Sequence, residues 1–214
     1  MGVALIAGAS GLTGGEVLKS LLEDSRCTSV ISLTRKPGNT KHPKLTEVIT
    51  DFGDVDGINL PSSVDDCFLC IGSTIAKAGS QEKFEQIDRH INISIARLAK
   101  KAGASRCALI SAAGANASSS IFYNKIKGIT EDDLIAIGFD KTYIFRPGLL
   151  LGDRKEKRTA EKISKVLMGT WTQHFFGKYA SIKVEQLGKA MVNVVHDANS
   201  SSGIYHFPDM KKYF

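Results

Sequence analysis

Three side chains in the middle of the chain have the types and spacing of a proton-transfer site. Ser111 precedes Tyr123, and Tyr123 and Lys127 are four residues apart, so on a helix these two would share one face. A lysine ammonium beside a phenol favours the phenolate, so we expect Lys127 to lower the pKa of Tyr123 toward neutrality. Tyr123 could then give a proton to a carbonyl oxygen or take one from an alcohol, while Ser111 hydrogen-bonds the same oxygen. A solvated helix face is the alternative, since Tyr-x-x-x-Lys also arises by chance.

A glycine-rich loop near the start of the chain has the form of a dinucleotide-binding turn. Its glycines follow Gly-x-x-Gly-x-x-Gly, directly after an apolar strand pattern and before a helical one. Glycine permits the sharp turn and lets the backbone approach a pyrophosphate, which the helix N-terminus then binds. Because glycines also mark plain turns, this strand-then-helix context is what favours nucleotide binding. The predicted loop consists of Gly8, Ser10, Gly11, Leu12, Thr13 and Gly14.

The residues after the second predicted strand favour NADP over NAD. An NAD-binding chain usually carries Asp or Glu there to hold the ribose, whereas this chain carries Arg35 and Lys36, which suit a 2′-phosphate. The alternative is an ordinary solvated basic loop. We expect further contacts to the adenine, the ribose and the nicotinamide where the third and fourth strands end. These predicted contacts are Asp51 and Phe52 after the third strand, and Gly72, Ser73 and Thr74 after the fourth.

The elements that must position these residues alternate between strands and helices. Short buried strand patterns and helices that stop at Gly103 and Gly138 predict a doubly wound parallel α/β sheet with both faces covered. The helix ending at Gly103 is expected to bury a stripe of Phe84, Ile87, Ile91, Ile95 and Leu98. The predicted strands are Val3–Gly8, Ser29–Leu33, Thr46–Thr50, Cys67–Ile71, Cys107–Ser111 and Thr142–Phe145, and the other predicted helices are Leu12–Leu22 and Tyr123–Ile137.

The pattern loosens after Pro147. Helices are expected at Glu161–Met168 and Val184–Val195, and a short last strand at Gly203–Phe207. We therefore predict one domain over residues 1–214, with a nucleotide-binding core at 1–150 and a small substrate-side cap at 151–214. Several cap residues could clamp an anionic substrate or line an apolar pocket, although ion pairing and core packing are their ordinary uses. They are Arg154, Arg158, Trp171, Phe175 and Phe176.

Composition limits the class of protein. The 214 residues are 43% hydrophobic and 23% charged, with a net charge of +6. The basic residues are scattered and form no aromatic-interleaved stripe, so we expect a phosphate-bearing ligand and no nucleic-acid partner. No run is long enough to span a bilayer, and no segment has the form of a secretory signal. The sequence therefore predicts a cytoplasmic protein without a membrane span.

The cysteines and histidines predict no metal site. Cys67 and Cys70 have zinc-knuckle spacing, but on a strand they point to opposite faces, and no second pair completes a site. We interpret them as small buried side chains in a reducing compartment. The remaining candidates, His174, His196 and His206, have no ligand-like spacing with carboxylates.

Four stretches of the chain together resemble one enzyme superfamily. They are Gly8–Gly14, Leu109–Ala115, Ser120–Gly128 with Glu131, and Phe145–Gly148 continuing through Leu151–Arg154. The chain looks like an atypical or extended short-chain dehydrogenase/reductase, similar to small NAD(P)H-binding proteins related to the Tat-interacting oxidoreductase. The resemblance implies a Rossmann fold and a triad of Ser111, Tyr123 and Lys127, whose lysine also holds the nicotinamide ribose. It further implies that Arg146 and Pro147 lie beside the nicotinamide.

The sequence leaves two functions of different classes open. The first is an NADP-dependent oxidoreductase that moves hydride between the nicotinamide and a small carbonyl or alcohol substrate. The second is a non-enzymatic NADPH-binding redox sensor or scaffold that acts through a protein partner. A sugar-nucleotide epimerase fits less well, because only about 60 residues remain for the substrate beyond the predicted core. Asp88 and Asn92, one turn apart on the long helix, lie where the superfamily often places an Asn that contacts cofactor or water, although a half-exposed helix would carry such residues too.

Overall fold

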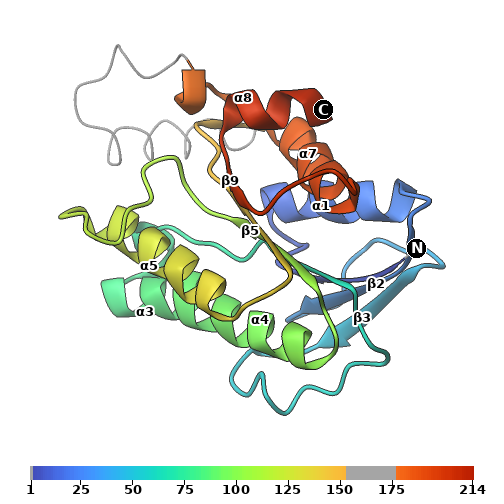
Figure 1. Cartoon of the computed structure of the whole chain (residues 1–214). Coiled ribbons are helices and arrows are strands. Elements are labelled where there is room, and N and C mark those ends of the chain that lie inside the picture. Colours follow the sequence, from blue (N-terminus) through green and yellow to red (C-terminus); the bar gives the residue numbers. More distant parts are fainter. Residues whose placement is uncertain (1, 153–176) are drawn as a thin grey trace.

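Seven parallel strands form the central sheet (Figure 1). The computed structural model describes residues 2–152 and 177–214. The strand order is β3-β2-β1-β4-β5-β6-β9, and the direction in which strands are added reverses between β1 and β4. These strands are β1 (Gly2–Ala7), β2 (Cys27–Thr34), β3 (Leu45–Ile49), β4 (Asp66–Leu69), β5 (Arg106–Ile110), β6 (Lys141–Phe145) and β9 (Gly203–Tyr205). The predicted doubly wound parallel sheet is confirmed.

Helices cover both faces of this sheet (Figure 1). On one face lie α1 (Leu12–Glu23) and α7 (Val184–His196), and on the other lie α4 (Asn92–Lys101) and α5 (Phe122–Ala136). The predicted helix Val184–Val195 is thus present, whereas Glu161–Met168 falls outside the described residues. The shorter elements are α2 (Ile75–Ala78), α3 (Gln81–Glu85), α8 (Phe207–Met210), the 3-10 turns Gly177–Tyr179 and Lys211–Tyr213, and the two-stranded ladder of β7 (Leu150–Leu151) and β8 (Ile182–Lys183).

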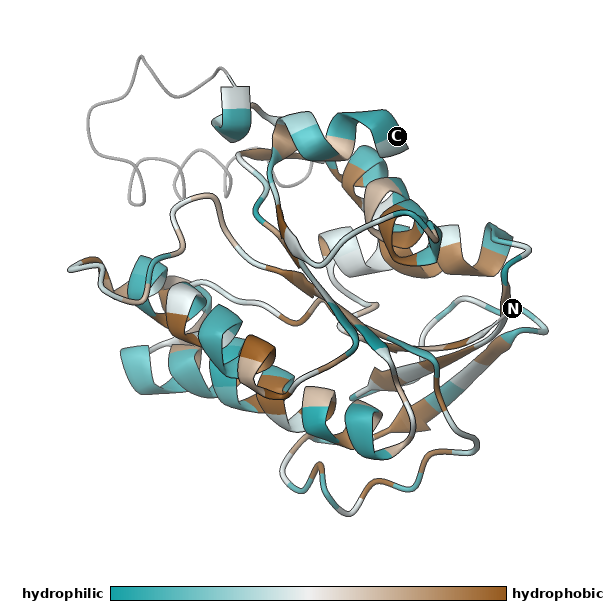
Figure 2. Cartoon of the chain, viewed as in Figure 1, coloured by the Kyte–Doolittle hydropathy of each residue, from teal (hydrophilic) through white to brown (hydrophobic). Residues whose placement is uncertain are grey.

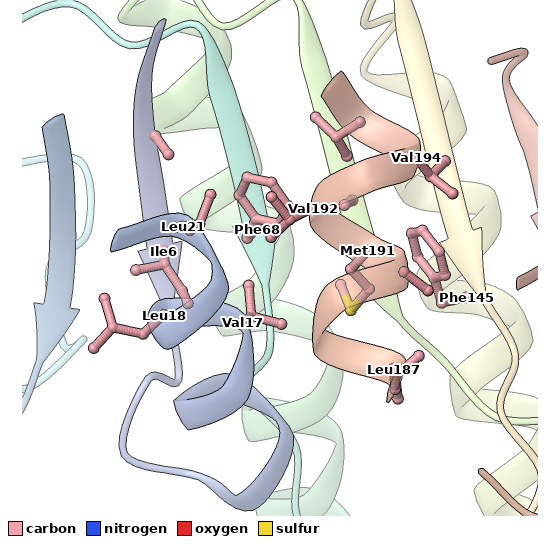
Figure 3. Close-up of a cluster of buried hydrophobic side chains, with 14 of the residues drawn as sticks. Ile6, Val17, Leu18, Leu21, Phe68, Phe145, Leu187, Met191, Val192 and Val194 are labelled. Atoms are coloured by element: carbon pink, nitrogen blue, oxygen red, sulfur yellow. The ribbon is translucent and has the colours of Figure 1, made fainter. Parts of the chain in front are cut away.

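The core between the sheet and the α1–α7 layer is built by alternate strand residues (Figure 3). Ile6 and Phe68 point from β1 and β4 into this layer, where Leu21 of α1 and Met191 of α7 meet them. All four are fully buried. Burying a side chain of this size stabilises the fold by about 1.5–3 kcal/mol, so α7 is held mainly by apolar contact.

The strand residues whose side chains point to the other face of the sheet build a second core beneath α4 and α5. Leu5 and Leu69 belong to it, together with Ile95 of α4 and Leu134 of α5. In Figure 2 the hydrophobic segments gather along the strands and on helix sides next to them, while α3 is largely hydrophilic. This two-sided burial explains why the strands read as continuous apolar runs in the sequence.

The long helix predicted around Phe84 is interrupted by a π-helical turn. Between α3 and α4, residues Gln86–Ile91 form this turn, called η1 here. Its effect is that the polar Asp88 and the following Asn92 are fully buried, whereas Ile87 and Ile91 are half-buried. The uninterrupted apolar stripe expected from the sequence is therefore wrong at this turn, and π turns of this kind recur at functional sites.

Candidate functional site

The glycine loop is packed so tightly that two of its glycines have no room for a side chain. Gly8 has φ +90°, and a Cβ there would lie 2.5 Å from the backbone carbon of Cys70. A Cβ on Gly14 would lie 2.1 Å from the carbonyl oxygen of Gly8. The loop thereby joins β1, β4 and the first turn of α1 at one point, as the tight strand-to-helix turn requires.

The start of α1 is open to a ligand. The N-cap residue of α1 is Gly11, and no side chain of the N-cap accepts a hydrogen bond from the amide groups of the first turn. A Cβ on Gly11 would meet only the carbonyl oxygen of Gly8, at 3.2 Å, and is otherwise unobstructed. Bare amides with the positive end of the helix dipole form a site for an anion, and a pyrophosphate fits it. The other predicted loop residues, Ser10, Leu12 and Thr13, lie at this same turn.

The predicted cofactor residues lie in loops at the carboxyl edge of the sheet. Arg35 and Lys36 follow β2 and are exposed. Asp51 and Phe52 follow β3, and Phe52 holds a φ of +64°, unusual for a residue with a side chain. Such strain is found most often where a loop contacts a ligand. In a doubly wound sheet, ligands bind outside this edge where the strand order reverses, so these loops lie on the side of the sheet where a dinucleotide would bind.

The loop after β4 is tied to the helix that follows it. The Ser73 N–H donates a 2.8 Å hydrogen bond to Asp88 Oδ2. The side-chain amide of Asn92 donates to the carbonyl oxygens of Ile71 and Asp88, at 3.0 Å each. Gly72 lies against this cluster, and Thr74 caps α2 by accepting from Lys77 N–H. The predicted ribose-binding segment is therefore held by two buried polar side chains.

Lys127 forms a buried ion pair with Asp88. Its Nζ lies 2.8 Å from Asp88 Oδ1, and the two side chains are 7% and 0% exposed. Burial alone would lower the pKa of Lys127, but the charges of Asp88, Tyr123 and Glu131 raise it above its usual value. Lys127 is thus a stable cation, and the ion pair ties α5 to the loop after β4.

Tyr123 does not have the low pKa that the sequence suggested. Burial raises its pKa above the usual value, Lys127 lowers it, and Asp88 raises it. The expected acidification is wrong chiefly because the phenol is buried, and the charge of Asp88 further offsets that of Lys127. The ring packs against Phe84 at a centroid distance of 5.4 Å. Among the described residues, no hydrogen bond links Tyr123 to Ser111 or to Lys127.

Ser111 belongs to a second buried cluster. Its hydroxyl donates to Glu131 Oε1, and Arg146 Nε donates to the same oxygen at 2.9 Å. The other Arg146 nitrogen, NH2, pairs with Glu131 Oε2. Pro147 continues the chain past β6, and its carbonyl accepts from Ala113 N–H at 3.2 Å. The loops after β5 and β6 are therefore joined through one carboxylate of α5.

Sequence reasoning did not foresee either carboxylate partner. Tyr123, Lys127 and Glu131 recur every four residues, so a polar stripe along one face of the predicted helix was visible. Asp88 and Asn92 have the same spacing on the preceding helix. Two polar stripes on neighbouring helices suggest that their residues pair across the interface. Which residue of one stripe contacts which residue of the other depends on how α5 packs against η1.

The cysteines Cys67 and Cys70 face opposite sides of the sheet, as strand geometry predicts, whereas His196 lies against two carboxylates that its sequence spacing did not reveal. Cys67 lies in the core beneath α4 and α5, whereas Cys70 packs against the other core, so the two do face opposite ways. Within the described ranges, no group of His, Cys, Asp and Glu could hold a metal ion. Nor does any helix there have the length and apolarity to cross a membrane. The residues His174, Arg154, Arg158, Trp171, Phe175 and Phe176 fall outside the described residues.

Comparison with known proteins identifies the family. A family model described as NAD(P)H-binding matches residues 8–198. The protein named "FMP52, mitochondrial" from Candida albicans is 39% identical over 198 residues, covering 88% of this chain and 85% of that protein. Its namesake from Eremothecium gossypii is 36% identical over 152 residues, covering 71% and 68%. These names describe no reaction.

Solved structures share the fold. The Bordetella bronchiseptica enzyme WbmH in complex with NAD+ has a TM-score of 0.72 and 18% identity, over 97% of this chain and 76% of that one. Human epimerase family protein SDR39U1 with NADPH has a TM-score of 0.63 and 16% identity, over 94% and 72%. The neighbours thus include both NAD and NADPH complexes.

The comparisons correct one expectation. Relatives that are 34–39% identical to this chain are named mitochondrial, so the cytoplasmic location inferred from the sequence is wrong. The comparisons, the glycine loop, the open start of α1 and the parallel sheet all point to a dinucleotide as the ligand. The chain therefore belongs to the NAD(P)H-binding family.

Proposed function

We propose that the protein is an NADP-dependent oxidoreductase of short-chain type that reduces a small carbonyl substrate. The observation that carries this proposal is the chain of contacts from Lys127 through Asp88 to the Ser73 amide. It fixes the Tyr123–Lys127 face of α5 against the loop expected to line the nicotinamide crevice. A proton donor is thereby held beside the place where hydride would leave the cofactor.

In this proposal each residue of the chain has a definite task. The start of α1, with Gly11 and Gly14, receives the pyrophosphate, and Arg35 with Lys36 receives a 2′-phosphate. When bound, NADPH supplies the hydride. Tyr123 gives its phenolic proton to the carbonyl oxygen, and Lys127 holds the ribose.

Ser111 is proposed to orient the substrate oxygen. Its only hydroxyl proton is directed to Glu131, so in this arrangement Ser111 offers a lone pair rather than a donor. Donation to the substrate therefore requires the Ser111 hydroxyl to turn away from Glu131 when the substrate binds. Arg146, paired with Glu131, lies in the loop proposed to border the nicotinamide with Pro147.

The proposal is tested by binding and turnover measured on the same preparations. NADPH and NADH are titrated by fluorescence, and aldehydes, ketones and quinones are then screened for NADPH oxidation. Tyr123→Phe should bind NADPH normally and lose at least about 100-fold in kcat. Tyr213→Phe is the matched control, since its hydroxyl bonds Asp197 and takes no part in the proposed site. Turnover that survives Tyr123→Phe would refute the role of this tyrosine.

A non-enzymatic NADPH sensor is the second candidate, and one observation favours it. Two of the three proposed reacting groups, Ser111 and Lys127, are already engaged with buried carboxylates. A protein that keeps the cofactor site but performs no chemistry would tolerate this arrangement. NADPH binding without reduction of any tested carbonyl, together with NADPH-dependent capture of a protein partner, would favour this candidate over the enzyme.

We also propose a mitochondrial location, which rests on the names of the relatives. A chain tagged at its C-terminus and imaged in yeast should coincide with a mitochondrial marker. A diffuse signal throughout the cytoplasm would contradict this proposal.

A further inference from the structure

Asp88 is a fully buried carboxylate on a helix face where the sequence suggested aliphatic packing. Its exposed fraction is 0%, as is that of Asn92, and the π turn η1 carries both residues toward the carboxyl edge of the sheet. An unpaired carboxylate at this depth would cost several kcal/mol, so its partners must compensate this cost. The contacts with these partners therefore indicate the role of Asp88.

Each oxygen of Asp88 has a separate partner. Oδ2 accepts from the Ser73 N–H, and Oδ1 lies 2.8 Å from Lys127 Nζ. Asn92 donates to the main-chain oxygen of Asp88 and to that of Ile71, which fixes the turn against the loop after β4. The carboxylate is thus held rigidly between the proposed cofactor loop and the lysine next to the reacting tyrosine.

The charges around Tyr123 come from three elements of the described chain. Lys127 and Glu131 lie on α5, Asp88 lies on η1, and Arg146 follows β6. Glu131 is paired with Arg146. Burial of the phenol is the largest cause of its raised pKa, while Lys127 lowers the pKa and Asp88 partly opposes Lys127. A lone ammonium would favour the phenolate more strongly than an ammonium paired with a carboxylate does.

We propose that Asp88 helps to keep Tyr123 in its protonated, proton-donating form, because its buried carboxylate pairs with Lys127 and offsets part of the lysine charge that would favour the phenolate. The inference rests on the proposed function of Tyr123 and deepens it. In reduction, a hydride supplied by the reduced dinucleotide, which is thereby oxidised, would add to the carbonyl carbon. The C=O π bond opens onto oxygen, which takes the proton as the Tyr123 O–H bond breaks and the alcohol O–H forms. The Tyr123 phenolate then takes up one proton from solvent, so each turnover consumes one proton. Alcohol oxidation would need the phenolate at the outset, which Asp88 disfavours.

The titration of Tyr123 tests the inference without any substrate. The chain has 5 tyrosines, so the phenolate absorbance of wild type minus that of Tyr123→Phe isolates this one. In wild type, Tyr123 should titrate above the ordinary tyrosine value of about 10. In Asp88→Asn, corrected by the same subtraction, the midpoint should fall by about 1 pH unit or more. If turnover is found, the limb on which the rate of alcohol oxidation rises with pH should shift to lower pH by the same amount.

A matched variant distinguishes the effect of the Asp88 charge on Tyr123 from the effect of losing an ion pair between η1 and α5. Asp133 pairs with Arg89 at 2.7 Å and, like Asp88, joins η1 to α5, so Asp133→Asn should leave the Tyr123 midpoint unchanged. A wild-type midpoint below about 10 overturns the inference even if Asp88→Asn fails to fold. An unchanged midpoint in folded Asp88→Asn overturns it as well. Absence of any carbonyl turnover would instead count against the proposed function and leave the titration result standing.

Discussion

The face of α5 that carries Tyr123, Lys127 and Glu131 buries ionisable groups that each need a partner. Lys127 finds Asp88, and Glu131 finds Arg146 and Ser111. Removing one member would leave the other charge buried and unpaired, which costs more than the pair itself contributes. For this reason the site is best tested with isosteric substitutions such as Asp88→Asn.

The residues after β2 give the first prediction, which concerns the choice of cofactor. Arg35→Ala should weaken NADPH binding about 10-fold, the loss expected for one charged hydrogen bond to a phosphate, and leave NADH binding unchanged. Dissociation constants for both dinucleotides provide the measurement. Lys41→Ala, an exposed cation farther along the same loop, is the control. Equal loss for NADPH and NADH would contradict a role in recognising the 2′-phosphate.

The glycine loop gives the second prediction, which uses two glycines of similar backbone conformation. Gly8→Ala should lower the free energy of unfolding by roughly 2–5 kcal/mol, because the left-handed backbone and the clash with Cys70 both penalise a side chain. Gly138 has φ +74° with nothing within 4 Å of its Cβ, so Gly138→Ala should cost only about 1 kcal/mol. Chemical denaturation measures both. Equal losses would mean that the close approach to β4 has no energetic weight.

At the scale of elements, what the sequence predicts follows from local rules. The glycine loop and the strand ends were predictable, because period, turn residues and the carboxyl-edge rule are read from neighbouring positions. The π turn was not, since the side-chain pattern from Phe84 to Leu98 fits an ordinary α-helix. Tertiary contacts favour the π turn instead. The wider turn lets Asp88 and Asn92 hydrogen-bond the loop after β4, and it brings Asp88 to Lys127.

The end of α7 shows the same limit. His196 donates from Nδ1 toward Asp24, 172 residues away, and its Nε2 lies 3.1 Å from Asp66. Arg26 and Arg106 also pair with these carboxylates. The sequence showed no ligand-like spacing between His196 and carboxylates, because its partners Asp24 and Asp66 are brought to it only by packing α7 against α1 and β4.

This charge network gives the third prediction, which concerns pH. Burial raises the pKa of Asp24, but hydrogen bonds from Arg26 and His196 outweigh it and hold the pKa well below its usual range. Because the folded pKa is depressed, the stabilisation is present above the unfolded value of about 3.9 and is lost as the pH falls below it. Asp24→Asn should therefore lower stability by roughly 1–3 kcal/mol at pH 7 and by much less near pH 2.

The control for this prediction is a carboxylate on the surface. Asp140 is 74% exposed and lies 3.7 Å from Lys100, so Asp140→Asn should change stability by less than about 1 kcal/mol at either pH. Denaturant unfolding at several pH values gives the comparison. A pH-independent loss in Asp24→Asn would show that the carboxylate charge is not what stabilises the end of α7.

At the scale of the whole molecule, the C-terminal elements do more than cover a substrate site. β9 extends the sheet beside β6, and α7 shares a core with α1, β1 and β4. The division into a core at 1–150 and a cap at 151–214 stays a prediction, but the described part of that cap supplies one of the two helices on its face of the sheet. Residues far apart in the chain thus build one folding unit.

The last prediction tests this unity. Met191 of α7 is fully buried between the sheet and α1 (Figure 3), so Met191→Ala should lower the free energy of unfolding by about 2–5 kcal/mol. Ile135 of α5 is 56% exposed, and Ile135→Ala should stay within about 0.5 kcal/mol of wild type. Because both helical layers pack on the same sheet, helix loss by circular dichroism and amide exchange in β1 and β4 should shift together in Met191→Ala. Early loss of α7 alone, with exchange in β1 unchanged, would instead identify α7 as a separable cap.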